Sequence, residues 1–167
     1  MTRSGMPVSA GPVPDSTARL DSAGLVASAR ALREAHRAAR AQTLLRGKYI
    51  AVLGEASADE ENLLQGAATE LGARITRVAT GLSGASAEKD VQDVAGMLGR
   101  FYDAVECHGL PPEVVQRLAH AVPVPLFERL ASPAHPTAQL ADLLGPEAAP
   151  GENRRCVLQA ALIGAIG

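Results

Sequence analysis

The hydrophobic and polar positions of this chain follow two alternating periods, and each period predicts a different kind of element. Apolar side chains that recur every three or four residues are typical of one face of a helix, whereas short apolar runs bounded by glycine or polar residues are typical of buried strands. Helical spacing occurs in the segments 25–36, 63–71, 91–98, 111–122, 140–144 and 152–167. The strand pattern occurs in the segments 49–53, 74–79, 103–106 and 124–127. Because strands and helices alternate along the chain, we predict an α/β fold: a three-layer domain with a four-stranded parallel sheet flanked by helices.

Two segments lie outside this alternation. Residues 1–16 contain serine, glycine and three prolines but lack the apolar stretch of a signal peptide, so we expect a disordered tail there. Residues 17–167 then form one domain, which is long enough to bury a sizeable core. Within it, the proline- and glycine-rich segment 145–151 is predicted to be a linker that leads into a closing helix over 152–167.

Composition narrows the classes of function. The apolar fraction of 47% and the charged fraction of 20% are typical of a globular protein. The net charge of −2 gives no basic field, so we expect neither a nucleic-acid partner nor a membrane partner, and no apolar run reaches the roughly 18 residues of a membrane span. Cys107 and Cys156 form neither a disulfide framework nor a zinc-binding spacing. Buried, reduced thiols favour a cytoplasmic protein.

Four short stretches carry a resemblance to a known family. They are Leu45–Lys48 before the first predicted strand, Leu98–Val105 (Leu-Gly-Arg-Phe-Tyr-Asp-Ala-Val), His135–Thr137 (His-Pro-Thr) and Glu152–Arg154. In this order and spacing they resemble the aspartate/ornithine carbamoyltransferases, and the second and fourth stretches resemble the ornithine type. The resemblance implies the carbamoyl-phosphate-binding domain together with the closing helix of the family. It also implies that a few residues replace the second, amino-acid-binding domain, which lies between those parts in the family.

The resemblance places the phosphate site of the family at the start of the second predicted helix. The family has a Ser-Thr-Arg-Thr-Arg run there, whose arginines and free helix N–H groups hold the phosphate. The matching stretch here keeps Ser57 but has Asp59 and Glu61 at the arginine positions. Each reversal replaces attraction by a repulsion of about 4 kcal/mol, at ~4 Å and an effective dielectric constant of about 20. Ser57 and Glu60 also form a capping-box pattern, so a stable helix start is one interpretation of these residues, and a bound cation or amine is another.

Further positions of the family follow the third and fourth predicted strands. His108 stands where the family has another arginine, and Ala138 stands where it has the glutamine of His-Pro-Thr-Gln. His135 and Thr137, which contact the carbamoyl group in the family, are retained. Because His108 and His135 both follow strands, they form either a metal-binding or acid–base pair or a remnant of a disused pocket. We predict no catalytic residue, no metal site and no cofactor.

These substitutions lead to a prediction of function. We expect an ornithine carbamoyltransferase-like protein that is catalytically inactive and acts by association, either as a homo-oligomer (a trimer) or with a full-length carbamoyltransferase. The alternative is an enzyme of the family that transfers a carbamoyl group to an amino acid, or a small-molecule-binding domain.

Overall fold

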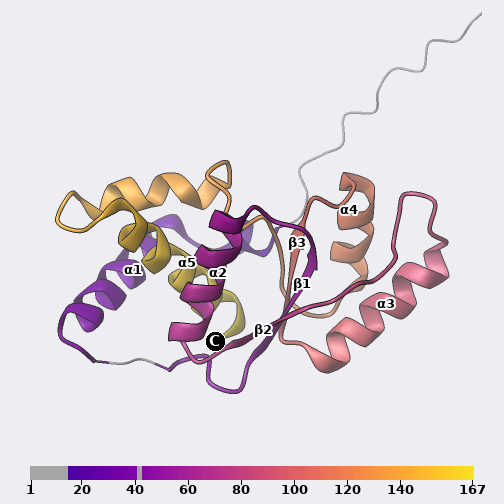
Figure 1. Cartoon of the computed structure of the whole chain (residues 1–167), viewed down its shortest axis with the longest axis horizontal. Helices are drawn as coiled ribbons and strands as arrows, with labels where there is room; N and C mark the ends of the chain where they lie inside the picture. Colours follow the sequence, from indigo (N-terminus) through magenta and orange to yellow (C-terminus); the bar gives the residue numbers. More distant parts are fainter. Residues whose placement is uncertain (1–14, 41–42) are drawn as a thin grey trace, which may run out of the picture.

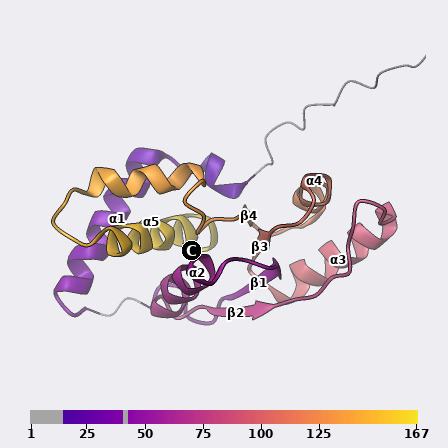
Figure 2. The ribbon, with the colours of Figure 1, turned by 45° about the horizontal axis from the view of Figure 1, so that its top comes forward.

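The computed structural model describes residues 15–40 and 43–167, and its architecture is the predicted three-layer α/β domain (Figures 1 and 2). The strands β1 (Tyr49–Gly54), β2 (Arg74–Arg77), β3 (Ala104–His108) and β4 (Leu126–Glu128) are parallel and lie in the order β2-β1-β3-β4. The helices are α1 (Ser22–Arg37), α2 (Ala58–Glu70), α3 (Glu88–Phe101), α4 (Pro112–Ala121) and α5 (Pro150–Ile166), with the 3-10 helices η1 (Ser16–Arg19) and η2 (Pro136–Leu144). Within the described residues no helix is long and apolar enough to cross a membrane.

Helices cover both faces of the sheet. Figures 1 and 2 show α1, α2 and α5 on one side and α3 and α4 on the other. Ile50 and Val52 belong to the apolar cluster that includes α1, α2 and α5, whereas Ala51 and Leu53 belong to the cluster that includes α3 and α4. Burial on both faces explains why the apolar run of β1 is uninterrupted.

Helix α5 lies inside the first of these clusters, against α1, α2 and η2. Its side chains Val157, Leu158 and Leu162 have no exposed surface. The helix begins at Pro150, ahead of the predicted start at residue 152, because proline is tolerated in the first turn, where its missing N–H loses no partner. The predicted linker 145–151 is therefore too long at its C-terminal end.

The N-terminal boundary also differs from the prediction. Ser16 Oγ accepts a hydrogen bond from Leu126 N (2.9 Å), and Asp15 Oδ2 accepts one from Glu128 N (2.7 Å). These side chains cap the outer edge of β4, which would otherwise present unpaired backbone donors. The predicted tail 1–16 is therefore wrong for its last two residues, and residues 1–14 lie outside the described residues.

The ends of the two central strands meet closely. Strand β3 continues to His108, beyond the predicted end at residue 106, because β1 pairs with it as far as Gly54. Gly54 has a φ of 81°, and a Cβ atom there would lie 1.8 Å from the carbonyl oxygen of His108. Glycine at this position therefore allows β1 to end against β3 and turn directly towards α2.

Smaller shifts affect three other elements. Strand β2 ends at Arg77, before the predicted residue 79. Strand β4 spans Leu126–Glu128 where 124–127 was predicted, because Pro125 has no N–H to contribute to the ladder. Helix η2 starts at Pro136 and not at residue 140, because the side chain of His135 caps it by accepting a hydrogen bond from Thr137 N.

Candidate functional site

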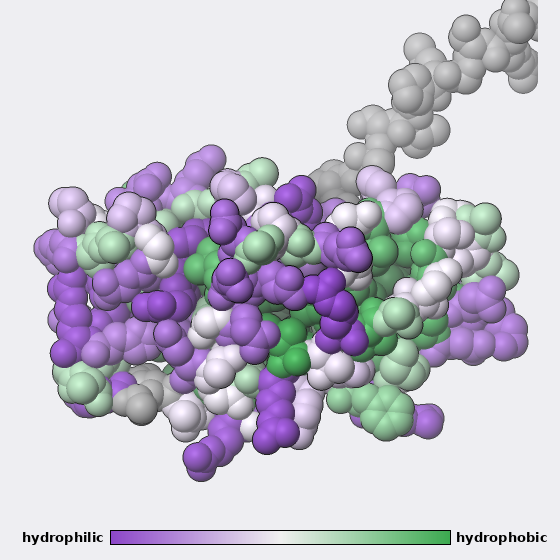
Figure 3. Space-filling view, viewed as in Figure 1, coloured by the Kyte–Doolittle hydropathy of each residue, from purple (hydrophilic) through white to green (hydrophobic). Residues whose placement is uncertain are grey.

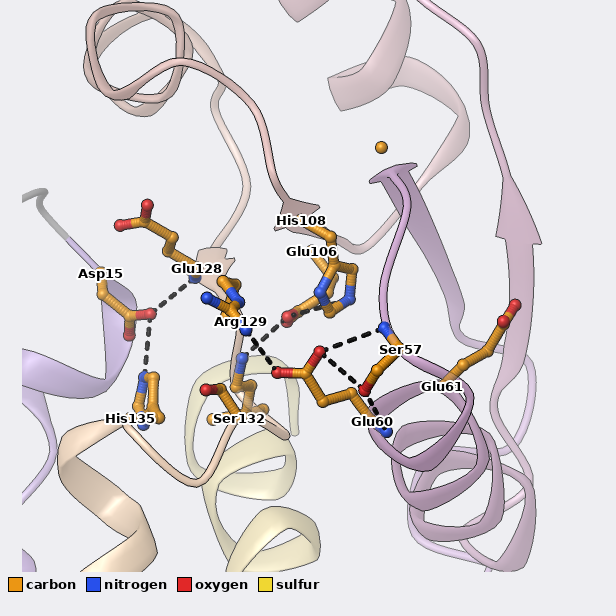
Figure 4. A network of polar contacts seen from close by, with 12 residues as sticks. Asp15, Ser57, Glu60, Glu61, Glu106, His108, Glu128, Arg129, Ser132 and His135 are labelled. Carbon is orange, nitrogen blue, oxygen red and sulfur yellow. Dashed lines mark hydrogen bonds and ion pairs between the residues drawn. The ribbon is translucent and has the colours of Figure 1, made fainter.

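The capping box predicted at the start of α2 is confirmed. Ser57 Oγ accepts a hydrogen bond from Glu60 N (3.3 Å), and the Glu60 carboxylate accepts from Ser57 N (3.2 Å) and from Ser57 Oγ (3.1 Å). Figure 4 shows the Glu60 side chain turned back towards Ser57. The donors of Ser57, the retained residue of the predicted phosphate site, are thus bound by a carboxylate of the protein itself.

Arg129, which the sequence did not point to, completes the set of donors around Glu60. Its Nη2 lies 2.9 Å from Glu60 Oε1, and Figure 4 shows the two side chains facing each other. Burial would raise the pKa of Glu60, but the hydrogen bonds from Arg129 and Ser57 outweigh burial and hold that pKa below its ordinary value. Arg129 has a φ of 51°, a left-handed conformation that costs a non-glycine residue about 1–2 kcal/mol. No local pattern marks this residue, because its ion pair joins positions 69 residues apart.

The two acidic residues at the predicted arginine positions face different surroundings. Asp59 is exposed and lines a large cavity beside α2. Glu61 pairs with Arg77 of β2 and lines a smaller cavity. Residues two positions apart on a helix do not face each other, so these carboxylates do not form one cluster. Among the described residues, no group of three or more His, Cys, Asp or Glu side chains could hold a metal ion.

His108 lies at the end of β3 next to Glu106, and both side chains are only 1% exposed. Glu106 Oε1 lies 3.4 Å from His108 Nε2 and accepts a hydrogen bond from Leu130 N (2.8 Å). Burial raises the pKa of Glu106 to about 8 and lowers the pKa of His108. An uncharged imidazole in this position offers a hydrogen bond but no positive charge to a phosphate.

His135 and Thr137 form a separate polar group. His135 Nδ1 lies 2.8 Å from Thr137 Oγ1, and His135 Nε2 lies 3.2 Å from Asp15 Oδ2. Thr137 Oγ1 also accepts a hydrogen bond from Arg154 Nη1 (3.3 Å). The structure therefore gives His108 and His135 different partners, and the predicted alternative of a metal-binding or acid–base pair between them is not formed (Figure 4).

The large cavity has a volume of about 700 Å³ and lies between α2, η2 and the start of α5. Ala138 is on its wall, beside Ala141 and Leu63. The guanidinium of Arg154, also on the wall, donates to the carbonyl groups of Leu130 and Ser132. Its pKa is lowered to about 10 by burial. The lining therefore combines small apolar side chains with polar groups, of which Arg154 and Glu60 are already paired within the protein.

Comparison with known proteins identifies the family. The family profile described as "Aspartate/ornithine carbamoyltransferase, carbamoyl-P binding domain" matches residues 15–146. This chain belongs to the aspartate/ornithine carbamoyltransferase family.

Its similar curated relatives are of the ornithine type. Ornithine carbamoyltransferase of Cutibacterium acnes is 38% identical over 121 residues, which is 72% of this chain and 36% of the relative. The catabolic ornithine carbamoyltransferase of Haemophilus influenzae is 35% identical over 116 residues, 69% of this chain and 35% of the relative. The chain thus spans about a third of the length of the curated relatives that it matches.

Solved structures share the fold. Ornithine carbamoyltransferase from Pyrococcus furiosus superposes with a TM-score of 0.61 at 22% identity, over 74% of this chain and 40% of that chain. A putative aspartate carbamoyltransferase from Trypanosoma cruzi superposes with a TM-score of 0.59 at 17% identity, over 81% of this chain and 46% of that chain. At these identities the likeness establishes the fold alone.

Proposed function

We propose that this chain is a non-catalytic member of the carbamoyltransferase family that acts by association, with itself or with a full-length carbamoyltransferase. The observation that carries the proposal is the position of the Glu60 carboxylate. It accepts hydrogen bonds from both donors of Ser57 and from Nη2 of Arg129, so these donors are not free to bind an anion at the start of α2.

A phosphate ligand would have to displace Glu60 and would then meet further negative charge. Asp59 and Glu61 stand at the positions that match the arginines of the family, and the guanidinium of Arg77 is already paired with Glu61. One repulsive pair at ~4 Å is worth about 4 kcal/mol at an effective dielectric constant of about 20. Even after screening by solvent, this repulsion supports the loss of phosphate affinity by orders of magnitude.

Transfer of the carbamoyl group has a second requirement. The acceptor amine must be held against the carbamoyl carbon, because proximity and orientation supply a large part of the rate enhancement. The matched region is about a third of the length of the curated relatives, so the groups that would hold an amino acid must come from outside it. The lack of these groups in the matched region supports the proposal independently of the charges at the start of α2.

Calorimetric titration with carbamoyl phosphate, together with a citrulline assay, tests inactivity. We expect no saturable heat with millimolar carbamoyl phosphate and no citrulline above the background. A variant with arginine restored, Asp59→Arg/Glu61→Arg/His108→Arg, serves as the comparison, because it should recover anion binding without transfer. Binding by the unmodified chain at millimolar concentration or tighter, or turnover that co-purifies through several columns, would contradict the proposal.

Sedimentation velocity tests the association. We expect a homo-oligomer, a trimer, at tens of micromolar protein, or a mixed complex when a full-length ornithine carbamoyltransferase is added. A protein that sediments only as a monomer and does not bind the full-length relative would rule this part out.

A small-molecule-binding domain is the second candidate, and the cavity of about 700 Å³ favours it. Cavities of this size with mostly apolar walls commonly bind small ligands. Ala138→Leu would fill part of this cavity, so a ligand found by screening should lose affinity in that variant.

A further inference from the structure

The large cavity has the size and the walls of a small-molecule site. Its volume of about 700 Å³ lies within the range of about 300–1,000 Å³ that is common for such sites. The apolar part of its wall comes from Leu63 of α2, Ala138 and Ala141 of η2, and Pro146 and Ala148 ahead of α5. On the face of the molecule that carries α2, Figure 3 shows apolar surface bordered by hydrophilic side chains. Such a wall favours a ligand that has an apolar body.

Two carboxylates of the lining have no partner in the protein. Asp59 lies in the first turn of α2 and Asp142 lies in η2, so they reach the cavity from different elements. Both residues are exposed, and within the part of the chain that the structure describes neither carboxylate takes part in a hydrogen bond or an ion pair. The adjacent Glu60, by contrast, is bound by Arg129. Asp59 and Asp142 are therefore the carboxylates of the lining with which a ligand can still pair.

The charges of the lining select the charge of the ligand. Glu60 is balanced by Arg129. Two carboxylates, Asp59 and Asp142, then stand against one guanidinium, that of Arg154. Both Nη atoms of this guanidinium already donate hydrogen bonds to oxygen atoms of the protein. The lining therefore has an excess of one negative charge, which favours a monocation over an anion, an uncharged molecule or a dication.

We propose that the large cavity binds an organic monocation: a protonated primary amine with an apolar body, whose ammonium group pairs with Asp59 and Asp142. The carboxylates hold the charged end of such a ligand and the apolar walls hold its body, whereas a metal ion would leave those walls unused. This inference rests on the second candidate function, a small-molecule-binding domain, and adds the class of the ligand. It is independent of the proposed loss of catalysis, since binding of an amine requires neither phosphate binding nor transfer.

Titration of the full chain at pH 7 with 4-phenylbutylamine, 4-phenylbutanol and 4-phenylbutyrate tests the proposal, because these probes share a shape and differ in charge. Backbone amide signals in ¹⁵N–¹H NMR spectra report both the affinity and the location. We expect saturable shifts in α2, η2 and the start of α5 with the amine. The alcohol should bind about tenfold more weakly, as the loss of two exposed ion pairs predicts, and the carboxylate should not saturate.

The outcomes separate the class of the ligand from the function. Binding of the alcohol as tight as that of the amine would leave the small-molecule-binding function standing and overturn the choice of an amine. Saturation by none of the three probes would overturn both. Shifts from the amine that map away from α2, η2 and α5 would overturn the location.

Matched variants test the two carboxylates. Asp59→Asn and Asp142→Asn should each weaken binding of the amine about threefold and leave binding of the alcohol unchanged, because an amide keeps the size of the side chain but not its charge. Asp90→Asn makes the same change at an exposed aspartate in the first turn of α3, outside the cavity, and should leave both affinities unchanged. All three positions are exposed, so none of these substitutions alters the core. Equal affinity for the amine in all three variants would overturn the assignment.

Discussion

The Glu106 carboxyl, with 1% of its side chain exposed, makes the stability of the fold depend on pH. Burial raises its pKa to about 8, although the hydrogen bond from Leu130 N acts in the other direction. Because its pKa in the folded protein exceeds the unfolded value of 4.5, the Glu106 carboxyl contributes its full stabilisation of the fold only below pH 4.5. This stabilisation is lost as pH rises through about 8. Burial lowers the pKa of His108 from 6.5, so the stabilisation that the uncharged imidazole contributes to the fold is lost as pH falls below 6.5. The window that isolates Glu106 therefore lies between pH 6.5 and about 8.

In this window the free energy of unfolding is expected to fall with rising pH, by up to about 1.4 kcal/mol per pH unit. Glu106→Gln should flatten the dependence, because the amide oxygen still accepts from Leu130 N but does not ionise. Urea unfolding at several pH values measures both slopes. Glu113→Gln, at an exposed carboxyl, is the control and should keep the slope of the unmodified protein. Parallel slopes for Glu106→Gln and the unmodified protein would show that Glu106 does not titrate in this range.

Arg129 offers a second test at the residue scale, because it combines an unfavourable backbone conformation with an ion pair to Glu60. Arg129→Ala keeps the left-handed backbone and leaves Glu60 with fewer donors, so we expect a loss of about 1 kcal/mol of stability. Arg129→Gly also removes the ion pair but relieves about 1 kcal/mol of backbone strain, so its stability should lie close to that of the unmodified protein. Chemical denaturation compares the two variants. Equal stability of the alanine and glycine variants would mean that the backbone of Arg129 carries no strain.

At the scale of the elements, the junction of β1 and β3 sets the position of α2. Gly54 has a φ of 81°, and an added Cβ atom would lie 1.8 Å from the carbonyl oxygen of His108. Gly47 has a similar φ of 80°, but an added Cβ atom there would meet no atom within 4 Å. The two glycines therefore separate backbone strain from steric overlap.

Gly54→Ala is expected to destabilise the protein by roughly 3 kcal/mol or more, since β1 and β3 would have to move apart. Gly47→Ala should cost only about 1 kcal/mol, which is the penalty of a left-handed backbone. Thermal unfolding of both variants provides the comparison. Similar losses at the two positions would contradict the close approach of Gly54 to His108.

At the scale of the whole molecule, helix α5 at the C-terminal end of the described chain returns to complete the core. Helix α5 packs against both α1 and α2, so the first and last long helices of the described chain belong to one apolar cluster. Figure 2 shows α5 beside α1. The family profile ends at residue 146, before this helix begins. The matched domain and α5 are therefore expected to unfold together.

Leu158→Ala should lower the free energy of unfolding by about 2–5 kcal/mol, because Leu158 has no exposed surface. Ile163→Ala, at a half-buried position of the same helix, should cost less. A chain that ends at Pro150 should melt at a lower temperature than the whole protein, or fail to fold. An unchanged melting temperature for the shortened chain would disprove the structural role of α5.

The amino-acid sequence was sufficient to predict the helices and strands, their layered arrangement and the helix start at Ser57. Periodicity revealed the buried strands because residues 50–53 are apolar on both faces, and the capping box was visible because Ser57 and Glu60 are neighbours along the chain. The distant partners of the polar side chains, by contrast, became visible only in the folded structure. Glu60 is bound by Arg129, and His135 by Asp15, across 69 and 120 residues respectively, and no local pattern encodes contacts at such separation. Likewise the unpaired Nδ1 of His108 follows from the burial of every residue of β3, because burial and the choice of partner are properties of the packed molecule.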